Sequence, residues 1–276
     1  MTNINVLNEP KPFLRWAGGK SWLTDHIGSI VNGLTIKNYY EPFLGGGSLF
    51  LSLKPSNAFL SDVNEDLIST YCAVQNNVEQ VIRYLKDFKN TPECYYEIRK
   101  LKFRSAYKRA AQFIYLNQTS FNGIYRVNLK GEYNVPFGYR NKNFYDPENL
   151  RIVSKGIQNY HFNAQDFGEI NSKIKGGDFI FLDPPYTVSH NNNGFIKYNQ
   201  KIFSLEDQHR LQELIEKIKS KGAYYILTNA AHKKIDEIFG RNDKKIELKR
   251  TTLVGGKNAK REVISEYLFT NIKTKV

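Results

Sequence analysis

The sequence lacks the features that mark disulfide-rich, metal-binding, secreted and membrane proteins. Its 276 residues include only two cysteines, Cys72 and Cys94, which are too far apart for the paired spacing of a zinc site or a disulfide framework. The five histidines show no metal-ligand spacing, so we expect no catalytic metal. No apolar run approaches the roughly 20 residues that cross a membrane, and the N-terminus has no basic-then-apolar signal. These absences predict a soluble, reduced, intracellular protein that contacts no membrane.

The chain is also poor in acidic side chains relative to basic ones. It has 40 Lys and Arg against 27 Asp and Glu, a formal net charge of +13. This surplus suggests a polyanionic partner, because neutralising phosphates drives nucleic-acid binding. A lysine-rich surface or an AT-rich genome gives the same surplus, so charge alone leaves both interpretations open. The aromatic residues, 14% of the chain, suit either base stacking or an ordinary core.

Strand and helix patterns alternate in the two end regions of the chain. The clearest helix, 203–222, begins with a capping box of Ser204 and Asp207 and ends at Gly222. Strand patterns cover residues 39–43, 58–60, 160–164, 178–182, 224–227, 245–249 and 264–270. This alternation predicts an α/β fold with a doubly wound, mostly parallel sheet.

The middle of the chain interrupts that alternation. Residues 64–118 have helical periodicity with a break near Asn76 and Asn77, and residues 124–135 alternate around Lys130 and Gly131 like a β-hairpin. We therefore predict an inserted second domain of helices and a hairpin. The predicted boundaries are 1–65 and 160–276 for the main domain and 66–159 for the insert.

Two segments in the first part of the chain suggest a cofactor site. EPFLGGGSLF, residues 41–50, places glycines between a predicted strand and helix, where the backbone can approach a ligand closely or simply turn. No Gly-Lys-Ser/Thr follows at P-loop spacing. Asp62 ends the next strand, where an acid can accept hydrogen bonds from both ribose hydroxyls or cap the following helix. Together these segments predict a nucleoside-type cofactor at the carboxyl ends of the strands.

FLRWAGGK, residues 13–20, is less informative. Its two glycines beside a tryptophan and a lysine fit a loop over a ligand or a plain turn before a helix near Ser21. On these residues alone we favour the turn.

The stretch FIFLDPPY, residues 179–186, carries the strongest signal. Four apolar residues predict a central strand, which places Asp183 at the edge of the sheet where open α/β folds bind ligands. Pro184 and Pro185 fix the backbone and lack N–H groups. The Asp183 carboxylate and the Pro184 carbonyl then form a rigid pair of acceptors, and Tyr186 offers a ring for stacking. A strand-ending turn is the alternative.

A planar aromatic amine matches this arrangement. Its lone pair is delocalised into the ring, and two acceptors pulling on its hydrogens favour a pyramidal, nucleophilic nitrogen. A methyl sulfonium held nearby could then be attacked in line. A base in a duplex must first be flipped out and stacked, and Tyr186 is the candidate platform.

The chain resembles the DNA adenine methyltransferase (Dam) family, which includes Dam-type and restriction–modification enzymes, over essentially its whole length. Five motifs in family order carry the resemblance: FLRWAGGK, EPFLGGGSLF, FLSDVNEDLI, LNQTSFNGIYRVNLKGEYNVPFG and LDPPY. The resemblance implies a site-specific, adenine-specific DNA methyltransferase with the S-adenosylmethionine-dependent fold, and an insert that recognises the target. It implies S-adenosylmethionine without a metal as cofactor and a flipped-out adenine in double-stranded DNA as substrate.

The same resemblance implies roles for individual residues. The cofactor would be bound by Trp16, Lys20, Phe43, Gly45, Gly47, Asp62, Asp166, Phe167 and Asp183. Catalysis would use Asp183, Pro184 and Tyr186. DNA would be contacted by Asn122, Ile124, Arg126, Asn128 and Pro136, and Arg15 is a further candidate for a phosphate contact. For Arg126, a bidentate pair with guanine and a phosphate clamp remain equal alternatives.

Two departures from the family leave the target sequence open, with GATC as one candidate. FGYRNK, residues 137–142, stands where GATC-specific members commonly have FGRYK, and residues 187–199 also differ from the GATC type. We expect the polar stretch 254–262 to be a loop near DNA or an exposed hairpin connection. We further expect a monomer or weak dimer acting at the nucleoid in the cytoplasm, with a restriction endonuclease as an optional companion.

Two other functions remain as alternatives. One keeps the chemistry but changes the substrate to RNA adenine or a protein glutamine amide, and the long insert argues against the small protein substrate. The other is a DNA-binding module with a vestigial cofactor pocket. Intact DPPY, the glycine cluster and Asp62 argue against that second alternative.

Overall fold

The computed structural model describes residues 9–128, 130–186, 203–241, 243–251 and 263–273. The chain forms two compact units. Unit 1 comprises Met1–His26, Gly45–Ser56 and Asp62–Ala164, and unit 2 comprises Ile27–Leu44, Asn57–Ser61 and Gln165–Val276. The predicted insert, 66–159, falls within unit 1, and its separate role in target recognition stays a prediction.

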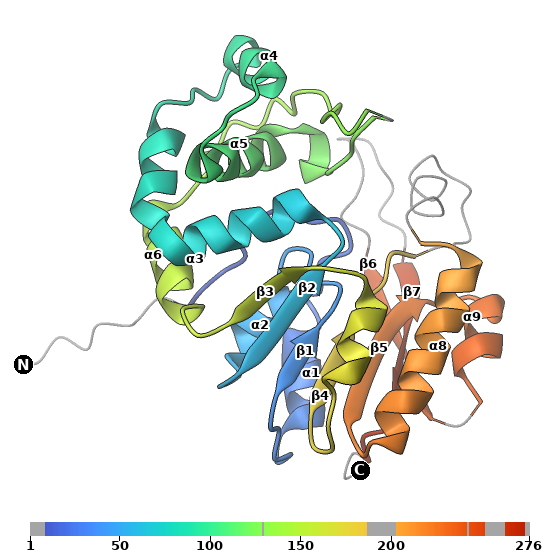
Figure 1. The fold of residues 1–276 in the computed structure, drawn as a ribbon. Helices are drawn as coiled ribbons and strands as arrows, with labels where there is room; N and C mark the ends of the chain where they lie inside the picture. Colours follow the sequence, from blue (N-terminus) through green and yellow to red (C-terminus); the bar gives the residue numbers. More distant parts are fainter. Residues whose placement is uncertain (1–8, 129, 187–202, 242, 252–262, 274–276) are drawn as a thin grey trace, which may run out of the picture. The chain divides into compact units, whose positions relative to one another are not determined.

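The strands form a seven-stranded sheet with the order β3-β2-β1-β4-β5-β7-β6 (Figure 1). Pairing is parallel for β1 with β2 and β4, and for β4 with β5, whereas β7 is antiparallel to both β5 and β6. The strands are β1 (Tyr39–Glu41), β2 (Ala58–Asp62), β3 (His161–Ala164), β4 (Phe179–Leu182), β5 (Tyr224–Ala230), β6 (Lys244–Thr251) and β7 (Val263–Thr270). This arrangement confirms the predicted α/β fold with a mostly parallel sheet.

Unit 2 is built around the apolar strand β4. All four of its residues are buried, as expected for a parallel strand with neighbours on both sides. Helix α8 (Leu205–Ser220) packs Leu211, Leu214, Ile215 and Ile218 into the same core. Its capping box is confirmed, because Ser204 accepts from the Asp207 N–H and Asp207 accepts from the Ser204 N–H. The helical turn η2 (Phe167–Ser172) and helix α9 (Lys233–Phe239) complete the unit.

Unit 1 is mostly helical. Its helices are α2 (Ser48–Leu53), α3 (Glu65–Lys86), α4 (Pro92–Lys100), α5 (Ala106–Thr119), η1 (Phe121–Gly123) and α6 (Pro147–Gly156), and α1 (Thr24–Val31) begins in it. Helices α3 and α5 lie side by side (Figure 1). The predicted break in α3 is confirmed, since Asn77 has non-helical angles of φ −157° and ψ 82°.

The predicted hairpin after α5 is held by a few backbone contacts among its described residues. Val127 bridges Tyr133, the Asn128 N–H donates to the Glu132 carbonyl at 2.8 Å, and the Asn134 N–H donates to Arg126 at 3.1 Å. The Val127–Tyr133 pair is an isolated bridge, so the described part of 124–135 pairs as the predicted hairpin without forming regular strands. The Asn128 side chain closes the turn, because its Oδ1 accepts from the N–H groups of Lys130 and Glu132. Local side-chain bonds of this kind compete with a regular ladder.

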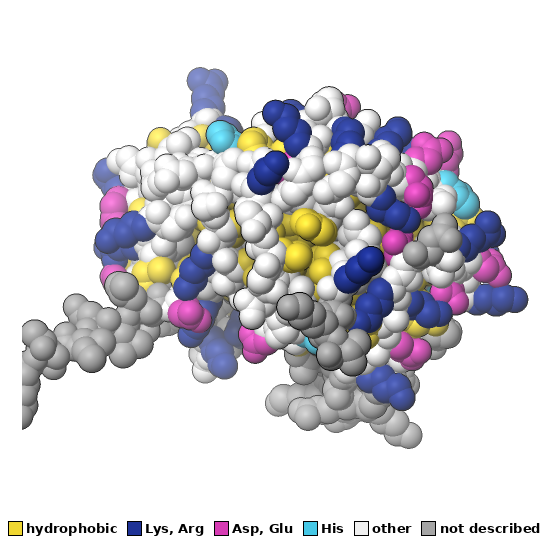
Figure 2. Space-filling view, turned by 90° about the horizontal axis from the view of Figure 1, so that it is seen from below, with side chains coloured by type: hydrophobic (Ala, Val, Ile, Leu, Met, Phe, Trp, Pro, Cys, Tyr) yellow, Lys and Arg dark blue, Asp and Glu magenta, His cyan; other side chains and the backbone are white. Residues whose placement is uncertain are grey.

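The surface carries mixed charge. On the face shown in Figure 2, Lys and Arg side chains lie interspersed with acidic ones. Over the described residues, no helix is both long and apolar enough to span a membrane.

Candidate active site

The glycine cluster forms a tight left-handed turn between β1 and α2 in unit 1. Gly45 and Gly47 have φ values of +48° and +65°, which favour glycine. A Cβ atom on Gly45 would lie 2.6 Å from Trp16 Cδ1, and one on Gly47 would collide with the Phe50 ring. The Trp16 and Phe50 rings fill the space that these Cβ atoms would need, so only glycine fits, and the turn carries no side chain of its own at Gly45 or Gly47.

Asp62 binds the backbone beside this turn. Its Oδ2 accepts from the Gly45 N–H at 3.1 Å, and its Oδ1 accepts from the Asn64 N–H at 3.0 Å. The suggestion that Asp62 caps the next helix is wrong, because Asn64 is the N-cap of α3 and accepts from the Leu67 N–H. Burial raises the pKa of Asp62, while N–H groups of Asn64, Gly45 and Val63 oppose that shift. Each carboxylate oxygen has two lone pairs, so the group can also accept from a ligand hydroxyl.

FLRWAGGK is a turn, as favoured, but it also covers the glycine cluster. The Gly19 N–H donates to the Trp16 carbonyl at 3.1 Å, and the Trp16 side chain lies against Gly45. Lys20 is only 3% exposed, and its ammonium donates to the Gly18 carbonyl at 2.6 Å. The segment thus places one aromatic ring and one buried cation in the same unit as the turn.

Trp16 is part of a cluster of three rings that joins this segment to the hairpin. Its ring stacks on Tyr125 with centroids 5.7 Å apart and on Phe113 at 6.5 Å. Phe113 and Tyr125 also contact each other at 5.3 Å. The residue preceding Arg126 in the hairpin therefore packs directly on a predicted cofactor residue.

Asn117 is a functional candidate that sequence reasoning missed. This α5 side chain is fully buried, accepts from the Arg15 N–H at 2.8 Å, and donates to the carbonyls of Arg15 at 2.7 Å and Gly123 at 3.3 Å. One amide thus holds the backbone beside Trp16 and the entry to the hairpin. The available signal was a polar amide at the end of the buried helical stretch FIYLN.

The predicted DNA contacts all lie in unit 1 but differ in environment. Asn122, Arg126 and Pro136 are exposed, whereas Arg15, Ile124 and Asn128 are half-buried. The Arg126 Nε donates to Asn134 Oδ1 at 2.8 Å, which orients the guanidinium along the hairpin. Asn128 is engaged within the turn, since its Nδ2 also donates to Glu132.

Arg15 is a half-buried cation in unit 1. Its guanidinium donates to the Ser120 carbonyl at 3.3 Å. Burial and the charge of Arg140 lower its pKa from the ordinary arginine value. The lowered pKa indicates a cation that a nearby anion would stabilise.

The DPPY motif lies directly after β4 in unit 2. The Thr228 hydroxyl on β5 donates to Asp183 Oδ1 at 2.6 Å, and this orients the carboxylate. The Tyr186 hydroxyl donates to Glu266 Oε2 at 2.7 Å. Burial and the charges of Asp183 and Glu266 raise the pKa of Tyr186 well above its usual value, so the phenol stays protonated. Thr228 and Glu266 were not predicted, because no local pattern marks them.

Phe43, Asp166 and Phe167 come together elsewhere in unit 2. The rings of Phe43 and Phe167 stack with centroids 5.3 Å apart, and the Arg210 guanidinium lies 4.7 Å from the Phe167 centroid. Asp166 accepts from Arg210 at 2.6 Å and caps η2 through the Gly168 N–H. The two rings offer an apolar surface, while the Asp166 carboxylate is already paired with a cation.

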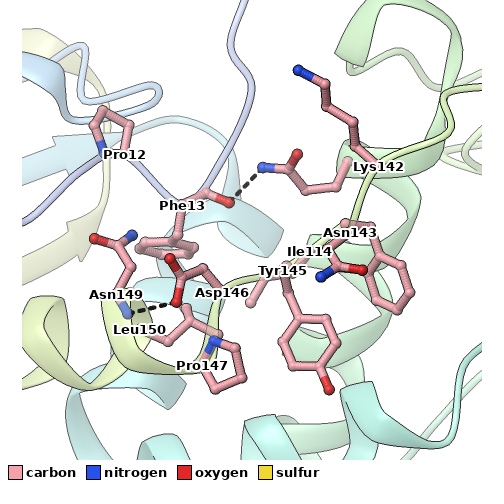
Figure 3. A pocket seen from close by; sticks show the side chains of 12 residues that line it. Pro12, Phe13, Ile114, Lys142, Asn143, Tyr145, Asp146, Pro147, Asn149 and Leu150 are labelled. Carbon is pink, nitrogen blue, oxygen red and sulfur yellow. Dashed lines mark hydrogen bonds between the residues drawn. The ribbon is translucent and has the colours of Figure 1, made fainter.

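A separate cavity of about 560 Å³ lies in unit 1 (Figure 3). None of the predicted site residues lines it. Polar groups at its wall are engaged with one another, since Gln118 donates to the Phe13 carbonyl and the Asn149 N–H donates to Asp146. We assign no role to this cavity. Within the described ranges, no group of three or more His, Cys, Asp or Glu residues could hold a metal ion.

Comparison with known proteins adds independent information. The sequence model of a family described as D12 class N6 adenine-specific DNA methyltransferase matches residues 16–252. The chain is 34% identical to the Type II methyltransferase M1.LlaDCHI of Lactococcus lactis subsp. cremoris, covering 97% of this chain and 99% of that protein. It is 35% identical to the Type II methyltransferase M.MjaIII of Methanocaldococcus jannaschii, covering 95% and 99%. It is 31% identical to the DNA adenine methylase of Escherichia coli, strain K12, covering 81% and 82%.

Proposed function

Because the chain belongs to the D12 class of N6 adenine-specific DNA methyltransferases, we propose that it transfers a methyl group from S-adenosylmethionine to a flipped-out adenine at a specific duplex DNA sequence. The enzyme class and the DNA adenine substrate follow from the family and its named members. The observation that carries the proposed chemistry is the Asp183 carboxylate, oriented by Thr228 at the end of β4 and followed by two prolines.

The residues of unit 1 fit the cofactor proposal. The glycine turn at Gly45 and Gly47 would accommodate its methionine portion, with Trp16 over the turn and the Lys20 cation for the carboxylate. Asp62 would accept from the ribose hydroxyls.

In unit 2, the Phe43 and Phe167 rings suit the adenine of the cofactor. Asp166, already bound to Arg210, would flank that ring. When bound, S-adenosylmethionine supplies an electrophilic methyl group on sulfur.

The chain's own residues would act on the target amino group. Asp183 and the Pro184 carbonyl would accept hydrogen bonds from its two N–H groups, which favours a pyramidal nitrogen with its lone pair available to the methyl group, and the Asp183 carboxylate would take the proton that the methylated nitrogen loses. Thr228 keeps the Asp183 carboxylate in one orientation. Tyr186 remains a neutral phenol because of its raised pKa, so it serves as a stacking surface and not as a base.

A methyl-transfer assay tests this function. The protein is incubated with labelled S-adenosylmethionine and either duplex DNA of mixed sequence or RNA of mixed sequence, and the label is mapped to a base and a sequence. We expect label on adenine at one short sequence, GATC being one candidate. Label on RNA alone would support the RNA alternative, and DNA binding without transfer would support a non-catalytic module.

Arg126→Ala distinguishes base recognition from phosphate binding. If Arg126 pairs with a guanine, we expect relaxed sequence choice and a cost of about 1–3 kcal/mol at the cognate site. If it holds a phosphate, affinity should fall equally for all sequences. The slope of log affinity against log salt concentration should then become smaller by about one, because one fewer counterion is released. Affinities for cognate and altered duplexes at several salt concentrations separate the two. Arg104→Ala, an exposed arginine before α5, is the matched control and should leave sequence choice unchanged.

Three further points remain proposals. Action on chromosomal DNA would place the protein at the nucleoid in the cytoplasm, and a monomer or weak dimer would suffice for one strand of a site. A restriction endonuclease companion is suggested by the Type II names of two relatives. A neighbouring gene whose product cleaves the unmethylated target would support that companion.

A further inference from the structure

Glu266 on β7 is a buried carboxylate in unit 2 that binds both Arg250 and Tyr186. Its side chain is 2% exposed. Its Oε1 accepts from the Arg250 Nε at 2.5 Å, and its Oε2 accepts from the Tyr186 hydroxyl at 2.7 Å. A buried carboxylate is costly unless its charge is paired and its oxygens are hydrogen-bonded, and these two contacts meet both conditions.

The strand register explains how these groups meet. Ala230 of β5 and Leu248 of β6 lie opposite Glu266, and Arg250 lies opposite Ile264. Residues two positions apart on neighbouring strands share a face, so Arg250 reaches Glu266 diagonally. Because β7 lies between β5 and β6, the carboxylate is held within the sheet and not on an edge strand.

Tyr186 is thereby restricted at both ends of its side chain. Pro184 and Pro185 limit the backbone conformations that precede it. A tyrosine ring is oriented by two torsion angles, so fixing the hydroxyl also restricts the plane of the ring. Asp183 is oriented in a comparable way by Thr228.

We propose that Glu266, held by Arg250, is a positioning residue that fixes the Tyr186 ring beside Asp183 for stacking of the target adenine. The inference rests on the proposed function, because it needs Tyr186 to face the base. It assigns a catalytic consequence to a contact between residues 80 positions apart in the sequence.

If the contact between Tyr186 and Glu266 had only a structural role, its loss would lower stability without changing the rate. A second buried tyrosine–carboxylate pair in unit 2 serves as the control for that case. The Tyr225 hydroxyl donates to Asp243 Oδ2 at 2.9 Å, and the same oxygen pairs with Lys219 at 2.8 Å. Tyr225 lies opposite Ile180, nearer the start of β4 than the DPPY motif.

The test compares Tyr186→Phe, Glu266→Gln, their double variant and the control Tyr225→Phe. Tyr186→Phe keeps the ring and removes only the hydroxyl, so stacking area is unchanged. Steady-state rates at saturating cofactor give kcat and the KM for DNA at the mapped sequence. Fluorescence of 2-aminopurine at the target adenine reports extrusion of the base.

We expect Tyr186→Phe and Glu266→Gln each to lower kcat about tenfold through loss of alignment, with little change in the KM for DNA. The double variant should be no slower than the slower single variant, because both substitutions act on the same contact: Tyr186→Phe removes it, and Glu266→Gln removes the charge that Arg250 holds in place. The 2-aminopurine signal should differ from wild type in the same variants. Tyr225→Phe should lower the melting temperature and keep the wild-type kcat.

The inference is overturned if Tyr186→Phe keeps the wild-type kcat and the wild-type 2-aminopurine fluorescence. It is also overturned if the kcat losses of the two single variants multiply in the double variant. If Glu266→Gln does not fold, Tyr186→Phe alone decides. Absence of methyl transfer by the wild-type protein would remove the proposed function and this inference together. An active wild type with an unaffected Tyr186→Phe removes the inference alone.

Discussion

Asp183→Ala should lower kcat by about a thousandfold or more, because it removes the charged acceptor at the reacting amino group. The fold should remain stable. The Thr228 hydroxyl loses its partner but lies 3.5 Å from the Leu182 carbonyl, to which it can turn. The expected stability loss is therefore only about 1 kcal/mol. Initial rates of methyl transfer, thermal unfolding and DNA retention measure the three quantities.

Asp178→Ala is the matched control for this experiment. Asp178 immediately precedes β4, is fully buried, and accepts from Asn38 at 2.8 Å and from the Lys175 N–H at 2.8 Å. Its loss should destabilise the protein and leave the kcat of the folded fraction unchanged. If Asp183→Ala instead destabilises the protein as strongly as Asp178→Ala and the folded fraction keeps its kcat, the DPPY motif serves only to end the strand. The catalytic assignment of Asp183 then fails.

The features that could be predicted from the sequence depend on neighbours in the chain. The capping box at Ser204 needs only Asp207, three residues away, and the buried strand before Asp183 shows in its own apolar run. The glycine turn was predicted for a similar reason, since Gly45 and Gly47 adopt a conformation that other residues avoid. These short-range rules were enough to locate the DPPY motif and the turn.

The contacts that orient these residues could not be predicted in the same way. Thr228 and Glu266 meet the DPPY motif from 45 and 80 positions away, through a strand order that places β7 between β5 and β6. For Asp62, the sequence offers two possible caps for the same helix and does not choose between them. Asp62 and Asn64 are both good capping residues, and only the backbone geometry assigns the cap to Asn64.

Helix α9 and the hairpin show the limits of periodicity. Helix α9 has only seven residues, so its apolar pattern is too short to stand out, although His232 caps it. In the hairpin, alternation correctly predicted that residues 124–135 fold back on themselves, as the bridge between Val127 and Tyr133 shows. It did not predict that the Asn128 side chain would close the turn, or that the described strands would pair through one isolated bridge.

Asn117→Ala should cause the largest loss of stability among the substitutions considered. The buried amide satisfies the Arg15 N–H and two carbonyls, at Arg15 and Gly123. Without it, these backbone groups lose their partner and a small cavity remains, at a cost of about 3–5 kcal/mol. Because Arg15 adjoins Trp16 and Gly123 immediately precedes the hairpin, affinity for S-adenosylmethionine and for DNA should both fall. Urea unfolding and binding titrations measure these effects.

Gln112→Ala provides the control on the same helix. Gln112 also uses its amide to bind two carbonyls, those of Ile98 at 2.7 Å and Leu101 at 2.8 Å, but these belong to α4 and its C-cap. Its loss should reduce stability while leaving the affinities of the folded protein near the wild-type values. If Asn117→Ala likewise binds cofactor and DNA as wild type does once folded, Asn117 stabilises unit 1 without organising the site. A selective loss of both affinities would instead show that the Asn117 amide positions the backbone next to Trp16 and the start of the hairpin relative to each other.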